Sequence, residues 1–196
     1  AIITAAPDSA DLAREEILSL RLGAHLLAEL SEGVLLIGLP EGFPTLVDTW
    51  RTLPPIFVRH VCPVQQWLPL PSASSSLMSS SPIIDALRER VVTRLAAQFD
   101  ADLPFSVQTR VLTGQPVGPY DVNTALAEAM IAQRNAPLDV RDPVQVLSVV
   151  LADYEGVSTG FLGISRVEDN LSSWAGGARR FAREAEQLSR AEFKLL

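Results

Sequence analysis

The sequence contains one cysteine, Cys62, and two histidines, His25 and His60. A single thiol cannot form an internal disulfide, and it excludes a site built from several thiolates. Two histidines leave few ligands for zinc. We therefore expect no metal site, and the lone thiol fits a cytoplasmic location.

Long uninterrupted apolar runs are also missing. The longest stretch without a charged side chain, 61–84, contains four prolines and a cluster of serines, which no membrane helix would carry. The first eight residues include no basic residue, so they do not resemble a signal peptide. We expect no membrane partner.

Positively charged residues are also few. The sequence has 16 lysines and arginines and 23 acidic residues, which gives a net charge of −7. This balance argues against nucleic-acid binding by bulk electrostatics alone. With 196 residues, of which 47% are hydrophobic, the chain is nevertheless long enough to bury a core and form one large domain or two small ones.

The first seventy residues predict the order strand, helix, two strands, helix, strand. Apolar runs indicate strands over 2–5, 25–30, 34–39 and 56–61. Asp8 or Ser9 can cap a first helix that ends before Gly23, and a second helix is expected over 44–52. This βαββαβ order is typical of the ferredoxin-like fold, which hosts many functions. We expect a ferredoxin-like domain over 1–70.

Residues 71–81 are rich in serine and proline and predict a linker. A second α/β domain follows over 82–168. Its first helix begins at Ser81 and Pro82, with Ile84, Leu87, Val91 and Leu95 on the apolar stripe. The alternation over 105–113 predicts a half-buried strand. A helix over 121–134, a short strand over 138–141 and two strands over 144–151 and 157–164 complete an α/β (α+β) fold.

Residues 169–196 predict a helical linker and the beginning of another helix. Ser189 and Glu192 form a capping box, yet no glycine, asparagine or proline ends the helix before Leu196. We expect that the chain is truncated just inside a further domain.

The last eight residues carry a resemblance to a known family. Ser189-Arg-Ala-Glu-Phe-Lys-Leu-Leu196 resembles the Ser-Arg-x-x-x-Lys-Leu-x-Glu helix that opens the catalytic domain of FtsJ-like ribosomal RNA 2′-O-ribose methyltransferases. Residues 51–60, and residues 159–165 followed by Trp174-Ala-Gly-Gly177, resemble segments of the ferredoxin-like and THUMP-type domains that precede it in larger bacterial members.

The resemblance implies that this chain is the RNA-binding, substrate-targeting region of such an enzyme, with ribosomal RNA and the missing catalytic domain as partners. The family uses a Lys-Asp-Lys-Glu set, and its first lysine matches Lys194, the only lysine of the chain. An ammonium there would favour the alkoxide of a ribose hydroxyl. The parent enzyme would use S-adenosylmethionine. This fragment lacks the rest of the set and a glycine-rich loop, so it should bind no cofactor and be inactive alone.

A THUMP-like domain requires a local basic face for RNA. The candidate contacts include Arg110, expected on the exposed side of its strand, and Arg141 near a loop; the others are Arg134, Arg179, Arg180, Arg183 and Arg190. Surface ion pairs are an equal explanation for each arginine alone. Trp174 either stacks on a base or packs between domains.

Two other functions stay open. The acidity favours a ferredoxin-like regulatory or protein-interaction module without an RNA partner. A self-contained hydrolase would need a nucleophile and a base, and no such pair can be recognised among His25, His60 and the serines.

Overall fold

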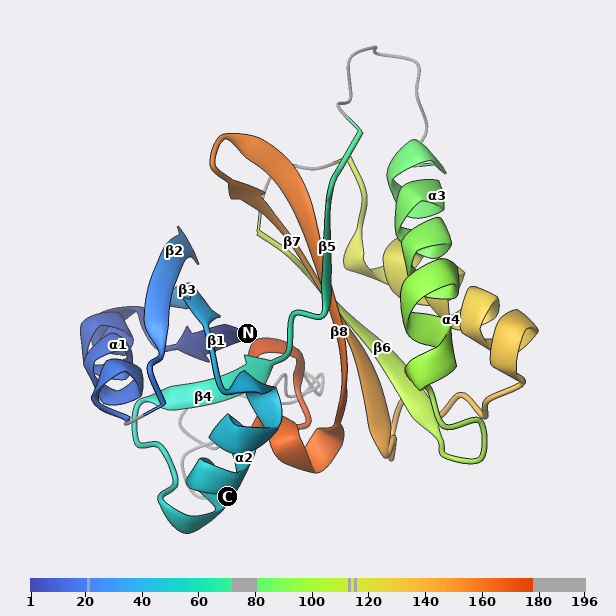
Figure 1. Ribbon diagram of the computed structural model, residues 1–196. Helices are drawn as coiled ribbons and strands as arrows, with labels where there is room; N and C mark the ends of the chain where they lie inside the picture. The colour runs from blue at the N-terminus through green and yellow to red at the C-terminus, as the bar shows by residue number, and fades with distance from the viewer. Residues whose placement is uncertain (21, 72–80, 113, 115, 178–196) are drawn as a thin grey trace, which may run out of the picture.

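The computed structural model describes residues 1–20, 22–71, 81–112, 114 and 116–177 (Figure 1). These residues form two four-stranded sheets, and each sheet has helices packed on one face. In Figure 1, α1 and α2 lie to the left with the first sheet, and α3 and α4 lie to the right of the second sheet. The α/β fold class predicted from the sequence is confirmed.

The first sheet has the strand order β2-β3-β1-β4, and all neighbouring strands are antiparallel. The elements follow one another as β1 (Ile2–Ala5), α1 (Ala10–Ser19), β2 (His25–Ser31), β3 (Val34–Gly38), α2 (Gly42–Thr52) and β4 (Val58–Cys62). This arrangement confirms the predicted βαββαβ order and its ferredoxin-like topology.

Alternate residues of the first sheet point to opposite faces. Ile3 and Leu35 pack under the helices against Ile17 of α1 and Trp50 of α2, all less than 5% exposed. The neighbouring residues on each strand point away from the helices and toward the second sheet.

The second sheet has the order β5-β8-β7-β6, in which β6 and β7 are parallel and the other neighbours antiparallel. Its elements are β5 (Gln66–Pro69), α3 (Ser81–Arg90), β6 (Phe105–Val111), α4 (Pro119–Arg134), β7 (Gln145–Tyr154) and β8 (Val157–Arg166). After α3 the chain continues as a π-helical turn, Val91–Leu95. Leu87, Val91 and Leu95, three residues of the predicted apolar stripe, are fully buried on this sheet, whereas Ile84 is half-buried.

Two expectations about the second half differ from the structure. Residues 66–69, placed with the first domain, form β5 and pair with β8 of the second sheet, so that this sheet begins before the expected linker. Pro63 and Pro69 hide the strand in the sequence, because proline within an apolar run argues against a strand. Residues 138–141 are not a strand, since Leu138 forms only an isolated bridge with Phe105. Most of the expected linker, residues 72–80, lies outside the described residues.

The two sheets pack against each other through the faces that carry no helices. Ile2 and Leu36 of the first sheet and Val150 and Phe161 of the second sheet belong to one buried apolar cluster. The described part is therefore a four-layer arrangement of helices, sheet, sheet and helices.

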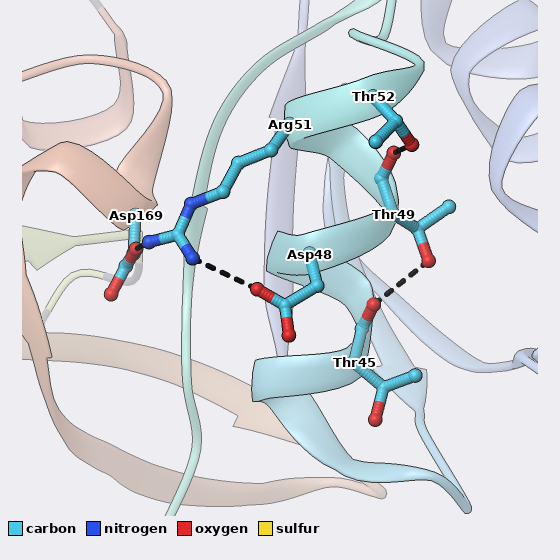
Figure 2. Close-up of polar contacts among 6 residues, drawn as sticks. All are labelled: Thr45, Asp48, Thr49, Arg51, Thr52 and Asp169. Atoms are coloured by element: carbon cyan, nitrogen blue, oxygen red, sulfur yellow. Dashed lines mark hydrogen bonds and ion pairs between the residues drawn. The ribbon is translucent and has the colours of Figure 1, made fainter.

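An ion pair adds a polar contact between the two halves. Figure 2 shows Arg51 of α2 between two carboxylates, with 2.8 Å from Nη1 to Asp48 Oδ1 and 2.8 Å from Nη2 to Asp169 Oδ1. Asp169 follows β8 in a short 3₁₀ helix. Burial raises the pKa of Asp169, and the opposing effect of Arg51 is smaller. Because Arg51 is 57% exposed, the pair contributes less than about 1 kcal/mol.

Candidate nucleic-acid interface

A groove of about 520 Å³ runs along β6, the edge strand of the second sheet. It is lined by residues 107–112, residues 173–175, Pro119 and Asn123 of α4, and Val140. Residues from both faces of β6 line the groove, which fits a channel that follows the open edge of the strand. Such a channel suits an extended ligand.

Trp174 lines this groove and has 43% of its surface exposed. The backbone around it is fixed by hydrogen bonds. Gln108 Nε2 donates to the carbonyl of Ser173 at 2.8 Å, and the amide of Gly177 donates to the carbonyl of Trp174 at 2.8 Å. A partly exposed indole on a fixed backbone can stack on a planar ligand with little loss of conformational entropy.

A second, more apolar cavity of about 330 Å³ adjoins the groove, with which it shares Val107, Asn123 and Val140. Tyr120, at the beginning of α4, lines this cavity and is 79% exposed. Two aromatic side chains therefore border one connected depression.

The polar lining of the groove is neutral except for one arginine. Gln108 Oε1 and Asn123 Oδ1 are buried and accept no hydrogen bond in the described part of the chain. The Gln108 amide cannot turn over, because its nitrogen is engaged by Ser173. Arg110 is the charged residue of the lining, and no carboxylate belongs to it. The arrangement can hold a planar group bearing amino donors.

Arg110 does not lie on an exposed face, contrary to the expectation from its strand. Its side chain is half-buried, and Nη1 donates to Thr4 Oγ1 of the first sheet at 2.7 Å. Burial lowers the pKa of Arg110. The sequence could not reveal this, because the face of β6 that carries Arg110 is covered by residues more than a hundred positions away.

The remaining candidate arginines are separate from the groove or are not described. Arg134 is half-buried at the end of α4, where Nη2 donates to the carbonyl of Phe99 at 3.1 Å. Arg141 is exposed beside Val140. Outside the described residues lie the other candidates, Arg179, Arg180, Arg183, Arg190 and Lys194. Of the arginines singled out from the sequence, the structure brings Arg110 to the groove.

Sequence reasoning noted Trp174 but missed Gln108, Asn123 and Tyr120. Gln108 alternates with apolar residues on β6, and Asn123 and Tyr120 lie in the first turns of α4. No local signal marks them, because strand, helix and the segment after β8 meet only in the folded chain.

The described residues contain no group of three or more metal-ligating side chains. Within the same residues, none of the helices combines the length and apolar character that crossing a bilayer requires.

No protein-family model and no curated protein matches the chain. Among solved structures it is similar to TrmN from Thermus thermophilus, with a TM-score of 0.64 and 18% identity over 87% of this chain and 46% of that one. PH1313 from Pyrococcus horikoshii Ot3 matches with a TM-score of 0.53 and 9% identity over 84% and 54%. A 4-thiouridine synthetase solved with RNA and ATP has a TM-score of 0.49 and 16% identity over 84% and 41%.

The chain thus spans about half the length of these three proteins. At such identities, the likeness to TrmN and PH1313 shows a shared fold over most of the chain.

Proposed function

We propose that this chain is the RNA-binding, substrate-targeting region of an S-adenosylmethionine-dependent RNA methyltransferase, and that the groove along β6 holds a single-stranded RNA segment. The observation that carries the proposal is Trp174, a 43% exposed tryptophan that lines a groove together with two amide side chains and one arginine. Base stacking on aromatic rings is the main sequence-tolerant contact of single-stranded RNA.

The charges of the chain agree with this mode of binding. A net charge of −7 repels phosphates, so that affinity has to come from stacking and from local contacts. The groove itself has no carboxylate among its lining residues. We infer that Arg179, Arg180, Arg183 and Arg190, which follow Trp174 in the sequence, add phosphate contacts.

The resemblance of the last eight residues supports a narrower proposal. The target is ribosomal RNA in the cytoplasm, the reaction is 2′-O-methylation of ribose, and Lys194 favours the ribose alkoxide. In the same proposal, the second half binds RNA as a THUMP-like domain. We propose that the reaction itself takes place in a part of the protein outside this sequence, which covers 46% of the length of TrmN.

The described residues do not fit the methyl donor. β6 and α4 form the parallel strand-to-helix step in which a nucleotide loop is expected, but their connection contains Pro116 and leads into Pro119. This connection contains Gly114 and Gly118, but Pro116 lies between them, and the segment does not match a glycine-rich nucleotide-binding turn. We therefore assign the donor to another part of the protein.

The binding proposal is tested by fluorescence anisotropy with an unstructured, labelled twelve-nucleotide RNA. Trp174→Ala should weaken binding by about tenfold or more, the loss expected for one stacked base. Trp67→Ala is the matched control, because Trp67 is 57% exposed on β5, the opposite edge strand of the same sheet. Equal losses in both variants would place the RNA elsewhere. Absence of binding by the native chain at low salt would favour a protein-interaction module.

The chemistry is tested on the full-length gene product with ribosomal RNA and labelled methyl donor. Methylation of a ribose 2′-hydroxyl makes the adjoining linkage resist alkaline hydrolysis, because that hydroxyl is the internal nucleophile. Label recovered in alkali-resistant dinucleotides supports ribose methylation. Label recovered in single nucleotides would contradict it and leave base methylation.

A further inference from the structure

Residues 173–177, which we call the strap, run from the groove into the junction between the two sheets. Their last three residues, Ala175–Gly177, contact β1 and β4 of the first sheet as well as β6 of the second. Two consecutive glycines shape this path, with φ of +64° at Gly176 and +69° at Gly177. Residues with a β-carbon rarely adopt such values.

Close contacts explain why both positions are glycine. A β-carbon at Gly176 would lie 2.6 Å from the Arg110 guanidinium carbon. A β-carbon at Gly177 would lie 2.9 Å from the backbone oxygen of Arg59 in β4. The strap therefore rests on the Arg110 side chain at one residue and on the backbone of the first sheet at the next.

The Arg110 guanidinium is itself held by the first sheet. Nη1 donates to Oγ1 of Thr4, a residue of β1 that is 6% exposed. At the other end of the strap, Gln108 fixes Ser173, and the amide of Gly177 closes onto the carbonyl of Trp174. A continuous series of contacts thus leads from Thr4 through Arg110 and Gly176 to the backbone of Trp174 at the groove.

We propose that Arg110 is a positioning residue for RNA binding: anchored by Thr4, it supports the strap and so holds Trp174 at the groove, and it does not act as a phosphate contact. The functional part of this inference rests on the proposed RNA binding. The first sheet then contributes to the groove through this support.

The support itself is tested without RNA by a double-mutant cycle that follows iodide quenching of Trp174. The background is Trp67→Phe, since Trp50 is buried and Trp67 is exposed. Gly176→Ala displaces the guanidinium and should raise the quenching constant by up to about twofold, because Trp174 is now 43% exposed. In an Arg110→Ala chain the clash is absent and only the backbone strain at φ of +64° remains, so adding Gly176→Ala should raise quenching clearly less than it does with Arg110 present.

Gly177→Ala is the matched control for the cycle. Its added methyl group meets the backbone of Arg59, so that Arg110→Ala should not relieve its effect. Two results would show that Arg110 does not support the strap. One is that the effects of Gly176→Ala and Arg110→Ala on quenching are additive. The other is that Arg110→Ala reduces the effects of Gly176→Ala and Gly177→Ala equally.

The role in binding is tested by the salt dependence of RNA affinity. If the Arg110 guanidinium bound a phosphate, Arg110→Ala would reduce the slope of log K against log salt by about one. If Arg110 instead positions Trp174, Arg110→Ala should bind RNA about three- to tenfold more weakly, with an unchanged slope of log K against log salt. This is the loss expected when one side chain has to be ordered on binding. Thr4→Val should reproduce this loss, and Thr4→Ser, which keeps the hydroxyl, should restore affinity.

The outcomes separate the two proposals. A reduced slope in Arg110→Ala, or native affinity in Thr4→Val, would refute positioning while leaving RNA binding in place. Absence of RNA binding by the native chain would refute the proposed function, whereas the quenching cycle would still decide whether Arg110 supports the strap.

Discussion

His60 and Cys62 of β4 lie two residues apart on one face, and both side chains are less than 5% exposed against the second sheet. Burial lowers the pKa of His60 to about 4, helped by the positive charge of Arg110. Burial raises the pKa of Cys62 to about 11, so that its thiol stays protonated at neutral pH. Both are therefore interior residues.

The shifted histidine predicts a loss of stability in acid. Between pH 6.5 and pH 4 the unfolded chain binds a proton that folded His60 rejects, so the free energy of unfolding should fall by about 3 kcal/mol over this range. Urea unfolding at a series of pH values measures it. His60→Gln should remove most of the slope.

His25→Gln is the control for this prediction, because His25 is exposed. It should leave the pH dependence unchanged. A His60→Gln chain that loses as much stability in acid as the native chain would assign the effect to other groups.

At the scale of elements, β8 depends on a close approach by the segment before β5. The Gln65 side chain bonds the backbone of Ile164 in β8 as a neighbouring strand would. Its Nε2 donates to the carbonyl of Ile164 at 3.1 Å, and its Oε1 accepts from the amide of Ile164 at 2.9 Å. Beside it, the carbonyl of Pro63 lies against Gly163, where a β-carbon has no room. This contact holds the β5 edge in register.

Gly163→Ala should therefore separate β8 from the Pro63 segment and lower the free energy of unfolding by about 2 kcal/mol. Chemical denaturation measures the change. Gly114→Ala, at a glycine with no atom within 4 Å of the added carbon, should change stability by less than about 0.5 kcal/mol. Equal stability of the two variants would show that β8 adapts without strain.

At the scale of the whole molecule, the two sheets share one apolar interface, and the ion pair of Arg51 with Asp169 spans it at an exposed site. Apolar burial contributes far more than this exposed pair. The halves should therefore unfold together, as a single cooperative unit.

Phe161→Ala tests this cooperativity, because Phe161 is 3% exposed on the second sheet and faces the first. We expect a loss of about 3 kcal/mol. Trp50, buried in the core of the first half, reports the transition in a chain with Trp67→Phe and Trp174→Phe. An unchanged midpoint of the Trp50 signal would mean that the halves unfold independently.

Local patterns were sufficient for most elements. Alternating residues, helical apolar stripes and turn glycines predict the βαββαβ order, helix α4 and the β7–β8 pair, because each of these depends on neighbours in the sequence. Ser9 is the N-cap residue of α1, but its side chain makes no capping hydrogen bond. The same reasoning failed at β5, because Pro63 before the strand and Pro69 at its end conceal a strand that pairs with the distant β8.

The sequence by itself determined that this chain folds as two α/β halves, because the period of its apolar residues fixes strands and helices locally. Only the tertiary structure decided which residues meet at the groove. Arg110 looks like a residue of an exposed strand face, yet the first sheet covers that face, and the strap brings Trp174 to β6. Contacts between such distant segments produce no periodic pattern in the sequence. They form only when the apolar faces of the two sheets are buried against each other.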